Sequence, residues 1–157
     1  MEGWLSLLVF IALNVAVAST GAIFQPGAWY RELAKPRWNP PNWLFGPVWT
    51  VLYATNAVSG WLVWETAGGA AGWAFAIYGI QLALNSLWSY LFFGLKRMDI
   101  ALGEVGLLWL SIAATIAAFA PFHTGAALML VPYLAWVTIA AALNLRLLQL
   151  NRDRVGA

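Results

Sequence analysis

The sequence contains no cysteine and only one histidine, His123. Disulfides, thiolate metal sites and thiol nucleophiles are therefore excluded. Charged residues make up only 9% of the 157 positions, whereas an ordinary soluble domain carries about 25%. No two carboxylates share a plausible site for acid–base catalysis, and we expect no metal site. The net charge of +2 gives no reason to expect a nucleic-acid partner.

Long uncharged stretches dominate what is present. They cover residues 3–30, 38–64, 66–95 and 105–145. A helix needs roughly 20 apolar residues to cross a membrane, so the first three stretches hold one helix each. The fourth is long enough for two, and it breaks at residues 120–125. The sequence therefore predicts one all-α domain over residues 1–157, an integral membrane bundle of five transmembrane helices at about 4–24, 43–64, 72–93, 100–119 and 126–148.

The positive charges are distributed unevenly over this topology. Five crossings place every lysine and arginine on one face of the membrane, and none on the face that holds the N-terminus. Positive residues favour the cytoplasmic side, so we expect the C-terminus and the long loop between the first two helices in the cytoplasm, and the N-terminus outside. The basic residues are Arg31, Lys35, Arg37, Lys96, Arg97, Arg146, Arg152 and Arg154.

The first loop, residues 25–41, is longer than a simple helix connection requires. It contains four prolines together with Trp29, Tyr30 and Trp38, and residues 28–34 are able to form a short surface helix. Two interpretations are open. The aromatic residues form an interfacial belt at the lipid headgroups, or the loop is a lid that covers the cytoplasmic end of the bundle.

The third predicted helix has two different faces. Gln81, Asn85 and Trp88 lie on one face, and they either line a pocket or bond a neighbouring helix. Small residues allow helices to approach closely in lipid, within one bundle or between two copies. We expect a homodimer through the small residues on the opposite face, which are Gly72, Ala76, Gly79 and Ala83.

Polar and aromatic side chains from several helices are expected at similar depths beneath the long loop. They are Thr20, Trp49, Asn85, Trp88 and Asn144, with Trp136 deeper. Such convergence is typical of a small-molecule pocket.

His123 and Glu104 are able to exchange protons, but the sequence gives each of them a structural role. We expect His123 in a polar turn on the opposite face, and Glu104 in the first turn of the fourth helix, where a carboxylate favours the helix N-terminus. No ionisable residue then marks a coupling-ion site inside the membrane.

Several motifs resemble those of one known family. They are Trp29-Tyr30, Lys35-Pro-Arg-Trp38-Asn39-Pro-Pro-Asn-Trp43-Leu-Phe45-Gly-Pro-Val-Trp49, Asn85-Ser-Leu-Trp88, Phe92-Phe93-Gly94 and Val131-Pro-Tyr133-Leu-Ala-Trp136. In order and spacing they resemble the signature of the translocator protein family over essentially the whole chain. The bacterial members of that family are called tryptophan-rich sensory proteins, and the mitochondrial members peripheral benzodiazepine receptors.

The resemblance implies a receptor for flat hydrophobic molecules, namely protoporphyrin IX, haem and, in some members, sterols. Porphyrin would be a ligand, no cofactor would be required, and the membrane would be the bacterial inner membrane. The run Leu143-Asn144-Leu145-Arg146 departs from the sterol motif of the animal members, so sterol binding is not expected. Together with the depth estimates, the resemblance gives as ligand-binding residues Thr20, Tyr30, Trp38, Trp49, Tyr53, Asn85, Trp88, Trp136, Ala140 and Asn144.

Family members have also been credited with light-dependent breakdown of porphyrin, which needs no acid–base pair. If this chain does so, the candidates are Trp49, Trp136 and Tyr30. Two other functions stay open: transport of tetrapyrroles or lipids, and a role as a membrane assembly or regulatory partner.

Overall fold

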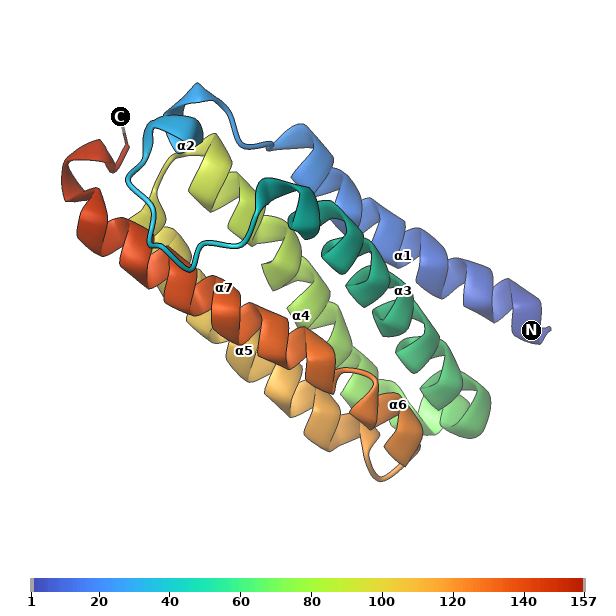
Figure 1. Cartoon of the computed structure of the whole chain (residues 1–157). Helices are drawn as coiled ribbons and strands as arrows, with labels where there is room; N and C mark the ends of the chain where they lie inside the picture. The colour runs from blue at the N-terminus through green and yellow to red at the C-terminus, as the bar shows by residue number, and fades with distance from the viewer. Residues whose placement is uncertain (1, 157) are drawn as a thin grey trace.

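Long helices form the body of the molecule in the computed structural model, which describes residues 2–156. These residues form helices and turns without a strand. The long helices run side by side (Figure 1): α1 (Gly3–Ile23), α3 (Asn42–Ala67), α4 (Gly72–Ser89), α5 (Met98–Phe119) and α7 (Val131–Leu150). The short elements are α2 (Ala28–Glu32), the 3-10 turns η1 (Gly68–Ala71) and η3 (Arg152–Arg154), the π-helix η2 (Tyr90–Gly94), and α6 (Thr124–Leu128).

Four helical stretches of the described residues are long and apolar enough to cross a membrane: Gly3–Ile23, Asn42–Gly94, Met98–Phe119 and Thr124–Leu150. The second has 53 residues and reverses direction after α3, at Gly68, whose φ of +52° suits glycine. The predicted all-α, multi-pass membrane bundle is confirmed. The count of five crossings stays a prediction.

The last long helix begins later than the sequence predicted. The predicted span was 126–148, whereas α7 starts at Val131, after the short α6 and a turn at residues 129–130. Pro132 lies in the first turn of α7, where its missing N–H leaves no helical hydrogen bond unmade. His123 caps α6, because its Nδ1 accepts the Ala126 N–H at 2.9 Å. It lies at the end of the bundle opposite α2 (Figure 1).

A chain of buried polar side chains ties four of the long helices together. Asn56 of α3 donates to Asn14 Oδ1 of α1 at 2.9 Å, and Gln81 of α4 donates to Asn56 Oδ1 at 3.1 Å. The Asn14 amide donates to the Tyr78 hydroxyl at 3.0 Å. The Tyr133 hydroxyl of α7 donates to Gln81 Oε1 at 3.0 Å. In lipid there is no water to satisfy such groups, so these bonds fix how the helices are rotated against one another.

The small residues of α4 face away from the bundle. Gly72, Ala76, Gly79 and Ala83 are exposed, and a Cβ added to either glycine would meet nothing within 4 Å. The sequence left open whether this stripe packs within one bundle or between two copies. The structure excludes packing within the bundle.

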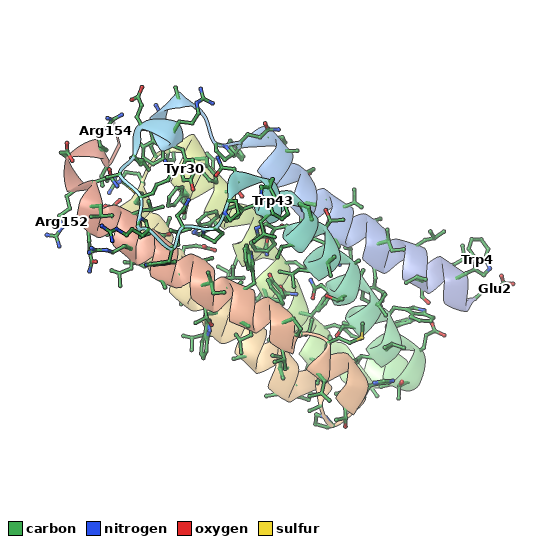
Figure 2. The ribbon with its side chains drawn as sticks, in the orientation of Figure 1. Glu2, Trp4, Tyr30, Trp43, Arg152 and Arg154 are labelled. Atoms are coloured by element: carbon green, nitrogen blue, oxygen red, sulfur yellow. The ribbon has the colours of Figure 1, made fainter. Side chains whose placement is uncertain are left out.

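The positive charges gather at the α2 end of the bundle. Figure 2 shows Arg152 and Arg154 at the same end as Tyr30, with Glu2 and Trp4 at the opposite end. The remaining basic residues lie in the loop of residues 25–41, in the α4–α5 connection and near the end of α7.

We expect the mutation Gly60→Ala to destabilise the bundle, because an added Cβ would lie 2.8 Å from the Phe10 ring and 3.0 Å from the Tyr78 ring. Overpacking of this kind costs about 1–3 kcal/mol, which thermal unfolding in detergent will report as a lower midpoint. Gly106→Ala is the matched control, since its Cβ meets open space. Equal midpoints for the two variants would show that α1, α3 and α4 do not pack this closely.

Candidate ligand-binding cavity

A cavity of about 600 Å³ lies beneath the loop of residues 25–41, within the usual range for small-molecule sites. We call this loop the lid. The cavity is lined by residues of α1, α3, α4, η2, α5 and α7, and by Gln25, Pro26 and Tyr30 of the lid. Its apolar lining includes Phe24, Phe45, Trp49, Tyr53, Trp88, Phe92, Phe93, Val105, Leu108, Trp136 and Leu147.

The lid is docked on the bundle by its aromatic residues. Trp29 and Tyr30 are 8% and 5% exposed, and Leu33 is buried beside them. Both rings meet Phe92 edge to face, at centroid distances of 5.9 Å and 6.3 Å. A belt at the headgroups would leave these rings outside the bundle, so the geometry favours the lid interpretation.

Two stacked aromatic pairs form flat walls of the cavity. Trp49 stacks on Tyr53 with centroids 5.5 Å apart and an interplanar angle of 29°. Trp88 stacks on Phe92 at 4.9 Å and 25°. The pairs come from different helices, α3 and the α4–η2 segment. Such surfaces suit a planar, polarisable ligand.

The polar side of the cavity continues into the buried polar chain of the bundle. The Tyr53 hydroxyl donates to Asn85 Oδ1 at 2.8 Å, and the Asn85 amide donates to the Tyr133 hydroxyl. Asn85 thus lines the cavity and bonds two neighbouring helices at once. The sequence left open whether Asn85 lines a pocket or contacts a neighbouring helix, and in the structure it does both.

A second polar contact lies nearer the lid. The Trp88 indole donates to Asn144 Oδ1 at 3.1 Å, and the Asn144 amide donates to the Met98 carbonyl at 2.9 Å. This pair joins α4 and α7 to the start of α5.

The Trp136 indole differs from the other cavity tryptophans. Its ring meets Phe45 edge to face at 5.6 Å, but its Nε1–H is buried and has no acceptor among the described residues. A buried donor without a partner is rare in folded proteins. Trp136 therefore lines the cavity with an indole whose N–H is buried and has no partner among the described residues.

Most of the sequence-predicted ligand residues come together here, and two do not. Thr20 does not line the cavity, because its hydroxyl turns back to the Val17 carbonyl of its own helix at 2.7 Å. Trp38 is 51% exposed on the lid and also lies outside it. The predicted residues that do line the cavity are Tyr30, Trp49, Tyr53, Asn85, Trp88, Trp136, Ala140 and Asn144.

Sequence reasoning missed several phenylalanines of the lining: Phe24, Phe45, Phe92 and Phe93. The signal for three of them was present, because Phe45, Phe92 and Phe93 belong to motifs quoted for the resemblance. Phe24 carried no such signal, since it reads as the last apolar residue of a transmembrane helix.

A smaller polar compartment of about 330 Å³ adjoins the lid and shares Tyr30 and Asn42 with the cavity. The Lys35 ammonium donates to the carbonyls of Tyr30, Arg31 and Leu33 at 2.7, 3.3 and 3.1 Å. The Lys35 ammonium therefore caps the carbonyl end of α2, and all three of its N–H groups are used. Burial lowers the pKa of Lys35. Arg31, which also lines the compartment, is exposed.

Glu104 is not where the sequence placed it. The fourth long helix begins at Met98, so Glu104 lies in its second turn and not its first. The residue is 6% exposed, and neither carboxyl oxygen has a hydrogen-bond partner among the described residues. The expected place of Glu104 in the first turn is therefore wrong, and the residue is a buried ionisable side chain of α5. The neighbouring Val105 lines the cavity.

Comparison with known proteins places this geometry in context. The sequence model of the TspO/MBR family matches residues 10–150. The chain is 44% identical over 154 residues to a tryptophan-rich sensory protein of Cereibacter sphaeroides, covering 98% of this chain and 96% of the relative. It is 44% identical to protein CrtK of Rhodobacter capsulatus, covering 94% and 95%. It is 40% identical to a translocator protein of Ovis aries, covering 80% and 76%.

Proposed function

Because this chain belongs to the TspO/MBR family of multi-pass membrane proteins, we propose that its lidded cavity is a receptor site for porphyrins such as protoporphyrin IX and haem. The observation that carries the proposal is the cavity of about 600 Å³ with stacked aromatic walls and the unpartnered Trp136 N–H. A flat macrocycle offers π-faces to the walls and acceptor atoms to that donor.

The polar edge of a porphyrin fits the smaller compartment. Protoporphyrin IX carries two propionates at one edge, and this edge would point toward the lid and the exposed guanidinium of Arg31. Lys35 is excluded from this role because its ammonium already bonds three carbonyls. The compartment shares Tyr30 and Asn42 with the cavity, so one ligand reaches both.

The macrocycle is expected to be held by its faces and not through iron. The lining of the cavity includes no histidine, cysteine or methionine among the described residues, and Tyr30 and Tyr53 are the lining residues of a type that can ligate haem iron. The Tyr53 hydroxyl already donates to Asn85. Binding of free protoporphyrin IX and haem with similar affinity would show that no tyrosine ligates the iron.

The site would open toward the cytoplasm of a bacterial cell, with the protein in the inner membrane. The lid end carries the basic residues, and such residues favour the cytoplasmic side. A ligand made or used in the cytoplasm would then reach the lid directly, as suits a sensor or scavenger. Light-dependent breakdown of the bound porphyrin stays a prediction drawn from the resemblance.

The test is titration of protoporphyrin IX into the purified protein, followed by tryptophan fluorescence. We expect saturable quenching, and Trp136→Phe should weaken binding about 2- to 10-fold through loss of one hydrogen bond. Trp43→Phe is the matched control, because Trp43 is 72% exposed and lies outside the lining. Quenching that never saturates would remove the receptor proposal and leave a partner-protein role. Equal affinities for the two variants would remove Trp136 from the site.

We also propose that two copies pair through the outward stripe of α4, Gly72, Ala76, Gly79 and Ala83. Small side chains let two helices approach closely in lipid, and nothing within the bundle occupies the space beside Gly79. Gly79→Leu should halve the protein mass of the detergent-solubilised particle in light scattering. Gly106→Leu, on the exposed face of α5, should not. A wild-type particle with the mass of one chain would contradict pairing.

Transport is the second candidate function, and Glu104 favours it. An acidic side chain buried in a membrane helix without a partner is a typical coupling-ion site. If the protein transports porphyrin with protons, a proton gradient should drive uptake into proteoliposomes, and Glu104→Gln should abolish that uptake while porphyrin still binds. Uptake that does not respond to the gradient, or that survives in Glu104→Gln, would exclude this mechanism.

A further inference from the structure

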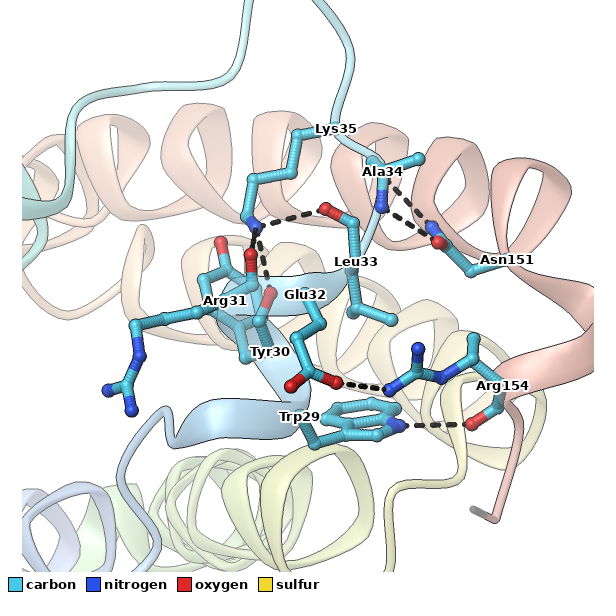
Figure 3. Close-up of polar contacts among 9 residues, drawn as sticks. All are labelled: Trp29, Tyr30, Arg31, Glu32, Leu33, Ala34, Lys35, Asn151 and Arg154. Carbon is cyan, nitrogen blue, oxygen red and sulfur yellow. Dashed lines mark hydrogen bonds and ion pairs between the residues drawn. The ribbon is translucent and has the colours of Figure 1, made fainter.

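The lid is fastened by the residues that follow α7. Asn151 is 4% exposed. Its Oδ1 accepts the Ala34 N–H at 2.8 Å, and its Nδ2 donates to the Ala34 carbonyl at 2.8 Å (Figure 3). One side chain thus satisfies both backbone groups of a lid residue. The same Nδ2 also donates to the Leu147 carbonyl in the last turn of α7 at 2.9 Å.

Two further contacts join the same segments. The Trp29 indole donates to the Arg154 carbonyl at 3.0 Å, and the Arg154 guanidinium pairs with the Glu32 carboxylate at 2.8 Å (Figure 3). The pairing holds the pKa of Glu32 below its usual range. We call residues 151–154 the clamp.

The contacts of the clamp differ in strength. The Glu32–Arg154 pair is exposed on both sides, with 60% and 34% of the side chains accessible, and exposed ion pairs contribute little and are screened by salt. The two Asn151 bonds to Ala34 are part-buried, and they join neutral groups that salt does not screen, although Ala34 itself is exposed. The Asn151 side chain is buried, and its amide would lose both partners if the lid opened. We therefore assign most of the attachment to Asn151 and little to the ion pair.

We propose that Asn151 is a positioning residue of the ligand site: it holds the lid closed, and a bound ligand leaves only when these bonds open. Tyr30, which lines the cavity, lies four residues before Ala34 in the lid. The attachment at Ala34 therefore keeps the Tyr30 ring over the cavity. The part that concerns ligand release rests on the proposed porphyrin site, and the part that concerns the lid does not.

The lid is tested in ligand-free, full-length protein by hydrogen exchange of residues 25–41. Asn151→Ala should raise their exchange rate about tenfold, as expected for the loss of two part-buried hydrogen bonds. Asn151→Asp should have an intermediate rate, because a carboxylate still accepts the Ala34 N–H but donates nothing to its carbonyl. Gln149→Ala is the matched control, since this exposed amide on α7 contacts only Arg146.

A second variant separates the clamp from simple fraying of α7. Trp29→Phe removes the bond to Arg154 but leaves a ring against Phe92, and it should raise lid exchange without affecting residues 143–150. Wild-type exchange should change little with salt, because the ion pair contributes little. Lid exchange that is equal in Asn151→Ala and Gln149→Ala would overturn the clamp.

The release step is tested by the dissociation rate of protoporphyrin IX in stopped flow. Asn151→Ala should accelerate dissociation in proportion to lid exchange, while Gln149→Ala should not. An unchanged dissociation rate despite faster lid exchange would overturn control of release by the lid and indicate an exit between the helices. If the wild type does not bind porphyrin, only the proposed function is contradicted. The attachment of the lid by Asn151 is tested separately, because hydrogen exchange is measured in ligand-free protein.

Discussion

The structure depends on the need to satisfy every polar group inside the membrane. Lipid supplies neither water nor a hydrophobic force between helices, so helix rotation is set by hydrogen bonds and by packing. Here a chain of bonds runs from Asn14 through Asn56, Gln81 and Tyr133 to Asn85. The chain therefore fixes the faces that α1, α3, α4 and α7 present to one another, and its last member brings the polar side of the cavity into place.

The cavity follows from this arrangement. Once Asn85 is fixed, Tyr53 and its stacking partner Trp49 are fixed with it. The lid then covers the opening with rings that pack on Phe92, and the clamp at Asn151 holds it there. Stacked aromatic walls, a cavity of about 600 Å³ and a polar side at Asn85 together suit a planar hydrophobic molecule with a polar edge. The described residues hold no cluster of His, Cys, Asp and Glu that could bind a metal ion.

The uncharged stretches predicted the helices, and the two faces of α4 were predicted from the spacing of its residues. The prolines and aromatics of residues 25–41 indicated either an interfacial belt or a lid. The rotation of the other helices was not predicted. Depth along a helix placed Trp49, Asn85 and Trp88 at one level, but it does not say which way a side chain turns. Thr20 lies outside the lining for this reason, whereas Glu104 was misplaced because its helix begins earlier, at Met98. Asn151 gave no signal, because a polar residue after a transmembrane helix ordinarily reads as solvated, and its partner Ala34 lies 117 positions away.

The central claim is that a planar ligand occupies the enclosed space between the aromatic walls. The most direct test is an experimental structure of the protein with protoporphyrin IX bound. The account predicts density for the macrocycle between Trp49, Trp88 and Trp136, within hydrogen-bonding reach of the Trp136 indole, with the propionates toward Arg31 and the lid closed above. Density for the porphyrin on the outer, lipid-facing surface, with the cavity unchanged, would contradict it.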